Sequence, residues 1–289
     1  MAQYTPVEFP YYAPRNELPA PLPTIHDIQN ATEIIDDGGW IEQKVVGIGP
    51  FVVKYGEAVS LEEGQKMQFV RACTTTVRVP RVYALFKDPL TPANYIVMEK
   101  IQGQTLQTLW ASLDDGRKDR ICRQLETNLT EMRALPSPGG YCALGNLPLN
   151  CPIYCKVRPT STEAEFNDAL ADACVRDVPD RHNPKEVWWT EYIRRAFASS
   201  LRDHPPTFSH GDLQTKNIMV SPEDDTVTII DWELSGWFPS YWEYTSAMIG
   251  AAGTMYETDW YKWMERFLVP YYNETAWHSL VSTCKYGGL

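Results

Sequence analysis

The sequence predicts an α+β fold in which a small antiparallel sheet is followed by a larger, mainly helical part. Short apolar runs bounded by Gly, Pro and Asn fill residues 45–101, as expected for strands. Apolar residues at helical spacing recur from residue 105 onward. The chain of 289 residues also exceeds a usual single domain of about 100 to 150 residues. We therefore expect a sheet domain over residues 37–101, a helical domain over 102–289 and an extension over 1–36.

The N-terminal extension is dominated by proline. Proline fixes φ and removes a backbone donor, so we expect neither regular helix nor regular sheet in residues 1–36. Tyr11 and Tyr12 are expected to anchor this strap onto the body of the protein. The six prolines are Pro6, Pro10, Pro14, Pro19, Pro21 and Pro23.

The segment V-V-G-I-G-P-F-V-V-K-Y-G, residues 45–56, predicts two strands around a glycine turn. Lys54 lies in the second strand, and it needs an anionic partner because an ammonium group is costly to bury alone. The phosphates of a nucleotide would supply that partner. Gly47 and Gly49 fit a plain hairpin turn as well as they fit a phosphate-binding loop.

The spacing of apolar residues indicates the remaining elements. Two more strands are expected in residues 77–86 and 95–103. Residues 136–188, rich in Pro, Gly and Cys and then in acids, show no clear pattern. Helices are expected over residues 59–71, 105–113, 116–135, 191–202 and 256–268.

The residues that carry chemistry lie between positions 208 and 233. Asp212 and Asn217 are separated by the five-residue step of a kinase catalytic loop, in which the aspartate accepts the hydroxyl proton and the asparagine binds Mg²⁺. Residues 218–220 and 227–230 predict a β-hairpin. That hairpin would return Asp231 to the side of Asn217, so that two hard oxygen ligands share one cation.

These motifs resemble the signature of the aminoglycoside phosphotransferase family, a branch of the protein-kinase-like fold. The matching residues form H-G-D-L-Q-T-K-N at 210–217, followed by Ile230 and Asp231. The continuation over 232–244 further resembles fungal members of that family, and the likeness covers roughly residues 45–267. It implies a two-lobed structure, with a nucleotide-binding sheet lobe and a mainly helical lobe that holds the catalytic loop, the metal site and the acceptor pocket.

The resemblance also implies how the sheet lobe binds ATP. Lys54 would hold the α- and β-phosphates, and Glu63 would orient Lys54, with Glu62 as the neighbouring rival. The backbone of the hinge would bind adenine. Its expected contacts are the carbonyl of Glu99, the amide of Ile101 and the side chain of Met98.

In the catalytic loop the resemblance assigns one role to each polar residue. Asp212 would orient the acceptor hydroxyl and take its proton, and His210 would brace the loop. Asn217 and Asp231 would bind Mg²⁺. Lys216 would help to neutralise the γ-phosphate, although a solvated loop lysine explains this residue equally well.

Composition narrows the class of partner. A net charge of −11 argues against nucleic acid, because phosphate backbones are bound by basic surfaces. No apolar run reaches the roughly 18 residues of a membrane span, and no signal-peptide pattern is present at the N-terminus. The seven cysteines have irregular spacing, which indicates neither a disulfide framework nor a zinc site. We expect a cytoplasmic protein that does not bind membranes. The sequence does not fix its oligomeric state, and a monomer is favoured.

We therefore expect an enzyme, an ATP-dependent phosphotransferase that moves the γ-phosphate of ATP to a hydroxyl of a small metabolite or antibiotic-like acceptor. No A-P-E motif follows the metal aspartate, which favours a small-molecule acceptor over a protein. Two alternatives stay open. One is a nucleotide-binding module without catalysis, and the other is an enzyme that uses the pocket on a natural product without phosphoryl transfer.

An aromatic segment after Asp231 gives an expectation about the acceptor. If its rings line the pocket, the acceptor is a neutral or singly charged, partly apolar alcohol. Packing of the large lobe is the equal alternative, because aromatic side chains supply much core burial. The candidate acceptor-binding residues are Glu233, Trp237, Tyr241, Trp242 and Glu243.

Overall fold

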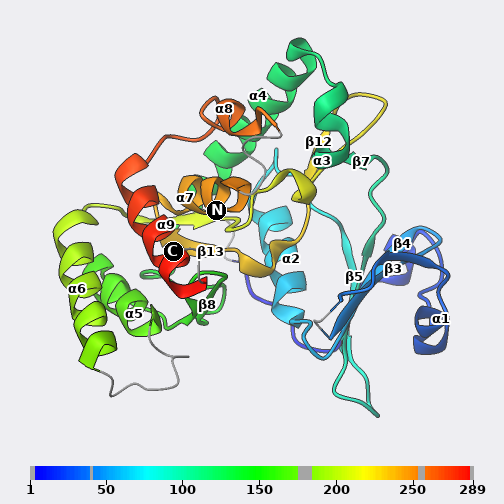
Figure 1. Ribbon diagram of the computed structural model, residues 1–289. Coiled ribbons are helices and arrows are strands. Elements are labelled where there is room, and N and C mark those ends of the chain that lie inside the picture. Colours follow the sequence, from blue (N-terminus) through cyan, green and yellow to red (C-terminus); the bar gives the residue numbers. More distant parts are fainter. Residues whose placement is uncertain (1–3, 40–41, 175–183, 253–257, 287–289) are drawn as a thin grey trace. The chain divides into compact units, whose positions relative to one another are not determined.

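The computed structural model describes residues 4–39, 42–174, 184–252 and 258–286, and Figure 1 shows its elements. The fold is α+β, as predicted. The chain divides into two compact units, each described separately below. The first unit holds residues 1–104 and 219–233, and the second holds 105–218 and 234–289.

The first unit is built on one antiparallel sheet of six strands, in the order β1-β5-β6-β4-β3-β2. The strands expected within residues 45–56 and 77–103 are present. A two-residue turn at Gly49 and Pro50 joins β3 to β4, and Gly49 supplies its positive φ of 56°. The strands are β1 (Tyr11–Tyr12), β2 (Glu33–Asp36), β3 (Gln43–Ile48), β4 (Phe51–Gly56), β5 (Val82–Lys87) and β6 (Asn94–Glu99).

The N-terminal extension corrects a prediction, because residues before 37 form regular structure. β1 and β2 are the two edge strands of the sheet, and Pro10 directly precedes β1, where the lack of a backbone donor costs few ladder hydrogen bonds. The expected anchoring is present: Tyr11 pairs with Leu85, and Tyr12 stacks on Phe86 at 5.9 Å. The segment also includes η1 (Arg15–Glu17) and α1 (Ile25–Gln29).

Helix α1 was missed although its start has a local signal. Thr24 accepts a hydrogen bond from the Asp27 amide, and the Asp27 carboxylate accepts one from the Thr24 amide, which makes a capping box. Ile28 is fully buried in the core of the first unit. The prolines therefore shape the path of this segment without preventing it from contributing to the core.

Helix α2 (Leu61–Cys73) packs against β5 and β6, and Figure 1 shows it beside β5. It begins after Ser60 and agrees, within two residues at each end, with the helix expected over residues 59–71. A Cβ at Gly64 would lie 2.1 Å from a methyl carbon of Leu85. Glycine at this position therefore lets the helix approach the sheet closely.

A hairpin from late in the chain completes the first unit. It comprises β11 (Ile218–Val220) and β12 (Val227–Ile229), which form a small sheet with β7 (Gln104–Thr105). The Ile229 amide donates to the Arg78 carbonyl at 3.0 Å. The chain then enters η4 (Trp232–Leu234), which immediately follows Asp231.

The second unit is mainly helical, and its core gathers buried aromatic and aliphatic side chains from α5, α6, β13, α7 and α9. In Figure 1, α5 and α6 run side by side, in agreement with their contacts. Its elements are α3 (Leu106–Leu109), η2 (Trp110–Ser112), α4 (Asp115–Arg133), β8 (Leu149–Cys151), β9 (Cys155–Val157), α5 (Glu163–Cys174), α6 (Pro184–Ser200), β10 (Pro206–Ser209), η3 (Thr215–Asn217), β13 (Gly236–Pro239), α7 (Trp242–Ala251), α8 (Trp260–Met264) and α9 (Tyr272–Tyr286).

Several helices of this unit differ from the prediction: α6 begins earlier than expected, and α7 was not predicted. Helix α5 lies in the region without a clear pattern, although Phe166 and Leu170 are four residues apart and both fully buried. The last predicted helix, 256–268, is the short α8, and its first two positions lie outside the described residues. Helix α9 was not predicted, because its apolar positions are interrupted by Ser, Thr, His and Asn.

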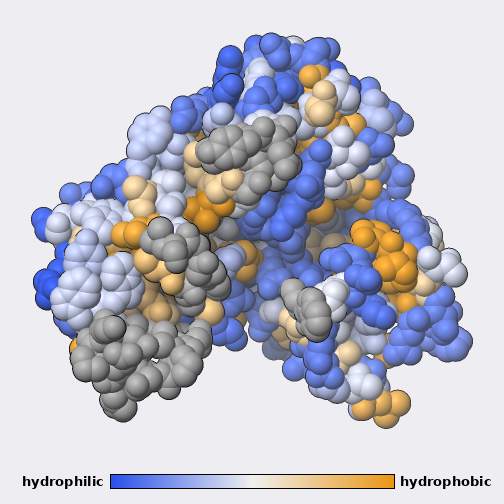
Figure 2. Space-filling view, in the orientation of Figure 1, coloured by the Kyte–Doolittle hydropathy of each residue, from blue (hydrophilic) through white to orange (hydrophobic). Residues whose placement is uncertain are grey.

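The visible surface is mostly polar. Figure 2 shows hydrophilic residues over much of one face, with separate apolar patches among them. Among the helices in the described part of the chain, none is long and apolar enough to cross a lipid bilayer.

Candidate active site

The first unit contains a buried lysine surrounded by carboxylates, which we call the Lys54 cluster (Lys54, Glu63, Asp231 and Glu233). The Lys54 ammonium lies 2.8 Å from Glu63, 3.0 Å from Asp231 and 3.3 Å from Glu233. Lys54 and Glu63 are both buried, whereas Asp231 and Glu233 are partly exposed. The ion pair predicted between Lys54 and Glu63 is thus present, and the rival Glu62 instead contacts the Ser60 hydroxyl.

The charges of this cluster stabilise one another. Burial acts to lower the pKa of Lys54, but the negative charges of Glu63, Asp231 and Glu233 outweigh it and raise this pKa above its usual value. Burial raises the pKa of Glu63, and Lys54 opposes that rise. The lysine is therefore held as a cation at a site where three acids converge.

Backbone contacts fix the segment that presents Asp231. Asp231 has φ 64°, a left-handed conformation that is uncommon for a residue with a side chain. Lys66, buried on α2, donates to the Glu233 carbonyl at 2.5 Å. The Trp232 indole donates to the Ile229 carbonyl at 2.9 Å. These two bonds hold the turn around Asp231 from both sides.

In the second unit, the loop after β10 orients Asp212. Asn217 donates from Nδ2 to the Asp212 carboxylate at 2.8 Å and to its carbonyl at 2.9 Å. Gln214 donates its side-chain amide to the other carboxylate oxygen. Lys216 lies 3.4 Å from Asp212 and is half exposed, so solvent weakens the attraction between these two charges. Asn217 and Asp231 belong to different units, and their sharing of one cation stays a prediction.

Glu243 holds this loop in place through its backbone amides. This corrects the expectation that Glu243 contacts the acceptor. Its carboxylate accepts from the His210 amide at 2.5 Å and from the Gly211 amide at 3.2 Å. Glu243 is 2% exposed, and burial raises its pKa to about 7. The Asp212 amide donates to Nδ1 of the fully buried His210 at 3.3 Å. Gly211 has φ 83° and packs against the Leu234 carbonyl, where a side chain would not fit.

The G-I-G segment forms a hairpin. Gly47 lies within β3, opposite Glu33 of β2, and a Cβ on Gly47 would meet the Glu33 carboxylate at 2.5 Å. Glu33 is itself held by Lys100 at 2.6 Å. Gly49 serves the turn and is exposed. These facts agree with the plain-turn alternative, and a phosphate contact at Gly47 or Gly49 stays a prediction.

The expected hinge follows β6. Met98 is nearly buried within the sheet, between Val52 and Val82. The Glu99 amide donates to the Arg81 carbonyl, and the Glu99 carboxylate accepts from the Arg81 amide. Ile101 follows in a partly exposed position. The adenine contacts assigned to Met98, Glu99 and Ile101 stay predictions.

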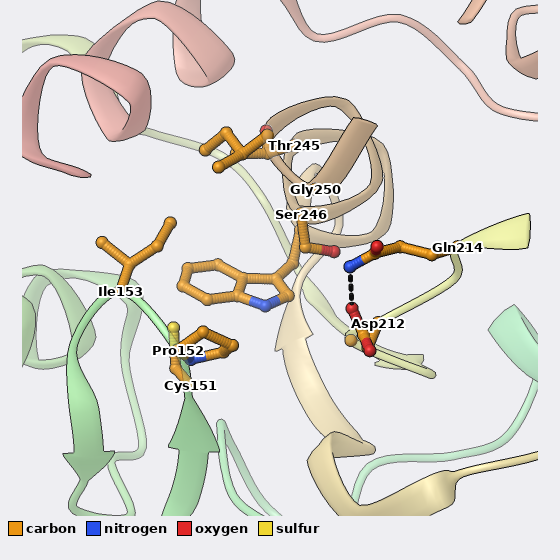
Figure 3. A pocket seen from close by; sticks show the side chains of 11 residues that line it. Cys151, Pro152, Ile153, Asp212, Gln214, Thr245, Ser246 and Gly250 are labelled. Atoms are coloured by element: carbon orange, nitrogen blue, oxygen red, sulfur yellow. Dashed lines mark hydrogen bonds between the residues drawn. The ribbon is translucent and has the colours of Figure 1, made fainter. Parts of the chain in front are cut away.

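A pocket of about 90 Å³ opens beside Asp212, entirely within the second unit, and we call it the Asp212 pocket (Figure 3). In Figure 3, Asp212 and Gln214 lie on one side, and Cys151, Pro152 and Ile153 lie on another. A larger hollow beside α9 has Tyr261 as its sole titratable group among the described residues that line it. The Asp212 pocket is lined by Cys151, Pro152, Ile153, Gly211, Asp212, Gln214, Trp242, Thr245, Ser246, Ile249 and Gly250.

The aromatic segment after η4 divides between pocket and core. Trp242 lines the Asp212 pocket. Trp237 is buried, packs on Phe208 at 4.9 Å and donates to a backbone carbonyl of the core. Tyr241 is fully buried and contacts His278. Trp237 and Tyr241 therefore serve packing, which corrects their expected place on the acceptor, and Glu233 lies in the Lys54 cluster of the other unit.

Two functional contacts were missed from the sequence. Gln214 holds Asp212, but a glutamine in a loop carries no periodic signal. Lys66 on α2 holds the Asp231 turn, and its spacing of three from Glu63 places both on one helix face. That spacing could have indicated Lys66, once Glu63 had been assigned to the interior.

Known structures establish the class of fold. A thermostable mutant of an aminoglycoside phosphotransferase, in apo form, aligns over 89% of this chain and 87% of its own with TM-score 0.58 and 12% identity. The Streptomyces rimosus aminoglycoside phosphotransferase aligns over 88% and 93% with TM-score 0.54 and 14% identity. The Streptococcus pneumoniae choline kinase aligns over 90% and 86% with TM-score 0.51 and 11% identity. The fold is thus protein-kinase-like and two-lobed.

The family follows from the sequence itself. The model of the Phosphotransferase enzyme family matches residues 37–278. The chain therefore belongs to this family, as the H-G-D-L-Q-T-K-N and I-D motifs predict. No curated protein matches the chain. The narrower resemblance to fungal members stays a prediction.

Proposed function

We propose that this protein transfers the γ-phosphoryl group of ATP to a hydroxyl group of a small molecule. The observation that carries the proposal is the Lys54 cluster, in which a buried ammonium is held 2.8 Å from Glu63 and 3.0 Å from Asp231. A fold that needed only stability would be served as well by apolar residues at these positions. Holding a cation ready for phosphates explains the arrangement.

The first unit supplies the groups for the nucleotide. Lys54 would bind its phosphates, and Glu63 fixes the position of Lys54. One carboxylate oxygen each from Glu63, Asp231 and Glu233 lies within 4.8 Å of the others, a set of hard donors that suits Mg²⁺. Bound Mg²⁺ would offset the negative charge of the phosphates. Asp231 is the ligand that we assign to it.

The second unit supplies the groups for the acceptor. Asp212 borders the pocket, so an acceptor hydroxyl there can donate its proton to this carboxylate. Asn217 uses its Nδ2 on Asp212, which leaves the amide oxygen as its ligand atom for Mg²⁺. Glu243 and His210 keep the loop in place through backbone contacts. Positioning and charge neutralisation would supply most of the acceleration.

Solved structures support a nucleotide donor. An aminoglycoside phosphotransferase of TM-score 0.53 was determined as a GDP complex. Another, of TM-score 0.50, was determined with ADP and hygromycin B. Membership of the Phosphotransferase enzyme family supports the same reaction class here.

Nucleotide binding provides the first test. Millimolar Mg·ATP should raise the melting temperature, because a ligand at about 100 times its Kd adds roughly 2.7 kcal/mol of stability. Lys54→Met should lose most of this shift, whereas Lys262→Met, on the surface of α8, should keep it. Absence of any shift in the natural protein would overturn nucleotide binding and favour a repurposed pocket.

Turnover separates the enzyme from a binding module. Incubation with ATP labelled at the γ-phosphate and a metabolite extract should give labelled small molecules. A nucleotide-induced shift without labelled product from any extract would instead support a binding module.

A further inference from the structure

We infer that the acceptor is an uncharged alcohol whose hydroxyl is carried on a compact apolar group. The inference rests on the proposed function, and it comes from the walls of the Asp212 pocket. Pro152 and Ile153, from the turn between β8 and β9, form one wall. Trp242 and Ile249 from α7 form another. Transfer of apolar groups from water into such surroundings is favourable.

One charged side chain borders the pocket, and neighbouring groups already engage it. Asp212 is the sole charged side chain among the described residues that line it. Its two carboxylate oxygens accept from Gln214 and Asn217, and Lys216 lies 3.4 Å away. Glu243 is buried and engaged by two backbone amides, so it adds no exposed anion. A cationic acceptor would lose hydration in this pocket without gaining a carboxylate of its own.

Some of the neutral polar groups that line the pocket already form hydrogen bonds within the protein. The Thr245 and Thr275 hydroxyl oxygens lie 3.1 Å apart, and the Ser246 hydroxyl donates to the Glu243 carbonyl at 3.2 Å. Gln214 remains as the neutral polar side chain that touches Asp212. The pocket therefore offers polar contacts around one hydroxyl and apolar contacts elsewhere.

Size limits the part of the acceptor that is enclosed. The pocket volume is about 90 Å³. A dry cavity that holds benzene measures about 150 Å³. This space therefore encloses only the hydroxyl-bearing end of the acceptor. The scarcity of carboxylates in the lining disfavours polycationic aminosugars.

A matched pair of alcohols tests this inference. Choline and its carbon isostere, in which a tert-butyl group replaces the trimethylammonium group, have the same shape and differ in charge. With the full chain and Mg·ATP, phosphorylation of the isostere should show a kcat/KM at least tenfold above that of choline. Kanamycin should be a poorer acceptor than either.

A charge placed in the wall should reverse the preference. Ile249 is partly buried on α7 and lines the pocket, so Ile249→Glu should shift the ratio of the two kcat/KM values at least tenfold toward choline. Ile249→Gln, of the same size without charge, should keep the isostere ahead. Equal shifts in the two variants would overturn the inference, as would a natural protein that prefers choline or kanamycin.

Binding decides the case in which neither probe is phosphorylated. Saturation-transfer NMR should then show a stronger signal for the isostere than for choline, and Ile249→Glu should invert the order. A stronger choline signal, or none from either probe, would overturn the inference while Mg·ATP still raises the melting temperature. Loss of that nucleotide effect would overturn the proposed function itself.

Discussion

The Lys54 cluster of the first unit and the Asp212 pocket of the second unit handle charge in opposite ways. In the cluster, one buried ammonium is surrounded by three carboxylates within 3.3 Å. In the pocket, one carboxylate is held by neutral amides and faces apolar walls. The proposed roles account for this difference, because binding phosphates requires fixed charges, whereas selecting a neutral alcohol requires a dry surface and a single proton acceptor. Because of this contrast, we expect mutations in the two regions to have different effects.

The largest expected effect separates chemistry from nucleotide binding. Asp212→Asn should lower phosphoryl transfer by about 10² to 10⁴ fold, because the hydroxyl proton loses its acceptor. Mg·ATP affinity, measured by calorimetry, should stay nearly unchanged. Asp231→Asn should instead weaken Mg·ATP binding, because a metal ligand loses its charge. If Asp212→Asn kept most of the transfer rate, the assigned base would be wrong.

Breaking the ion pair between Lys54 and Glu63 tests whether the Lys54 cluster serves nucleotide binding and not stability alone. Lys54→Met should cost about 3 to 5 kcal/mol of unfolding free energy, because Glu63 is left buried without its partner. The double variant Lys54→Met, Glu63→Leu should recover most of that loss in urea titrations, yet should not recover Mg·ATP binding. A double variant as unstable as the single one would contradict this account.

The dependence of stability on pH tests the role of a buried histidine in the core of the second unit. His278 is fully buried between the Tyr154 and Tyr241 hydroxyls, at 2.7 and 3.1 Å. Burial is the main cause, and the charge of His204 the second, of a pKa lowered from 6.5 to about 3. The unfolded chain then binds the proton first, so stability is lost as pH falls below 6.5. The loss is about 1.4 kcal/mol per pH unit until the folded value is reached. His278→Gln should flatten this dependence in urea titrations.

His204 serves as the control of opposite sign. Burial lowers its pKa, but the hydrogen bond to Glu163 and the charges of Glu163 and Glu274 raise it above the ordinary value. Its stabilisation is complete below pH 6.5 and is lost as pH rises through the raised pKa. The difference in stability between the natural protein and His204→Gln should therefore shrink toward alkaline pH. The same trend for both histidine variants would show that these assignments are wrong.

The smallest expected effect concerns the contact between Gln214 and Asp212. A Cβ at Gly250 would meet the Gln214 side-chain nitrogen at 2.6 Å, so Gly250→Ala should displace this flexible side chain. We expect a change in transfer rate of no more than about tenfold, since one positioning contact is lost. The helix itself should gain up to about 1 kcal/mol. Gly250→Ala should have no further effect on transfer in a Gln214→Ala background, and an additive effect would exclude this route.

Local pattern was sufficient for many elements of the fold. Alternation around G-I-G located β3 and β4, and apolar spacing over residues 116–135 located α4, on which Ile121, Leu125, Leu129 and Met132 are buried. The pattern failed at the N-terminus, where proline density suggested the absence of regular structure. Edge strands tolerate that density, and whether a segment reaches a sheet edge is a tertiary matter.

The sequence by itself determined the chemical groups and their order along the chain. Lys54 in an apolar strand and the five-residue step from Asp212 to Asn217 are local features, and they were sufficient to indicate the family. Only the tertiary structure decided which neighbours these groups have. It selected Glu63 over Glu62 for Lys54, because adjacent helix positions point about 100° apart.

The same holds for the aromatic rings of the second unit. Trp242 lines the Asp212 pocket, whereas Tyr241, one residue earlier, is fully buried beside His278. The sequence shows that both rings follow Asp231 along the chain, but it does not determine which way each ring points. Side-chain direction depends on the exact start of α7 and on what packs against it, and these are properties of the folded core.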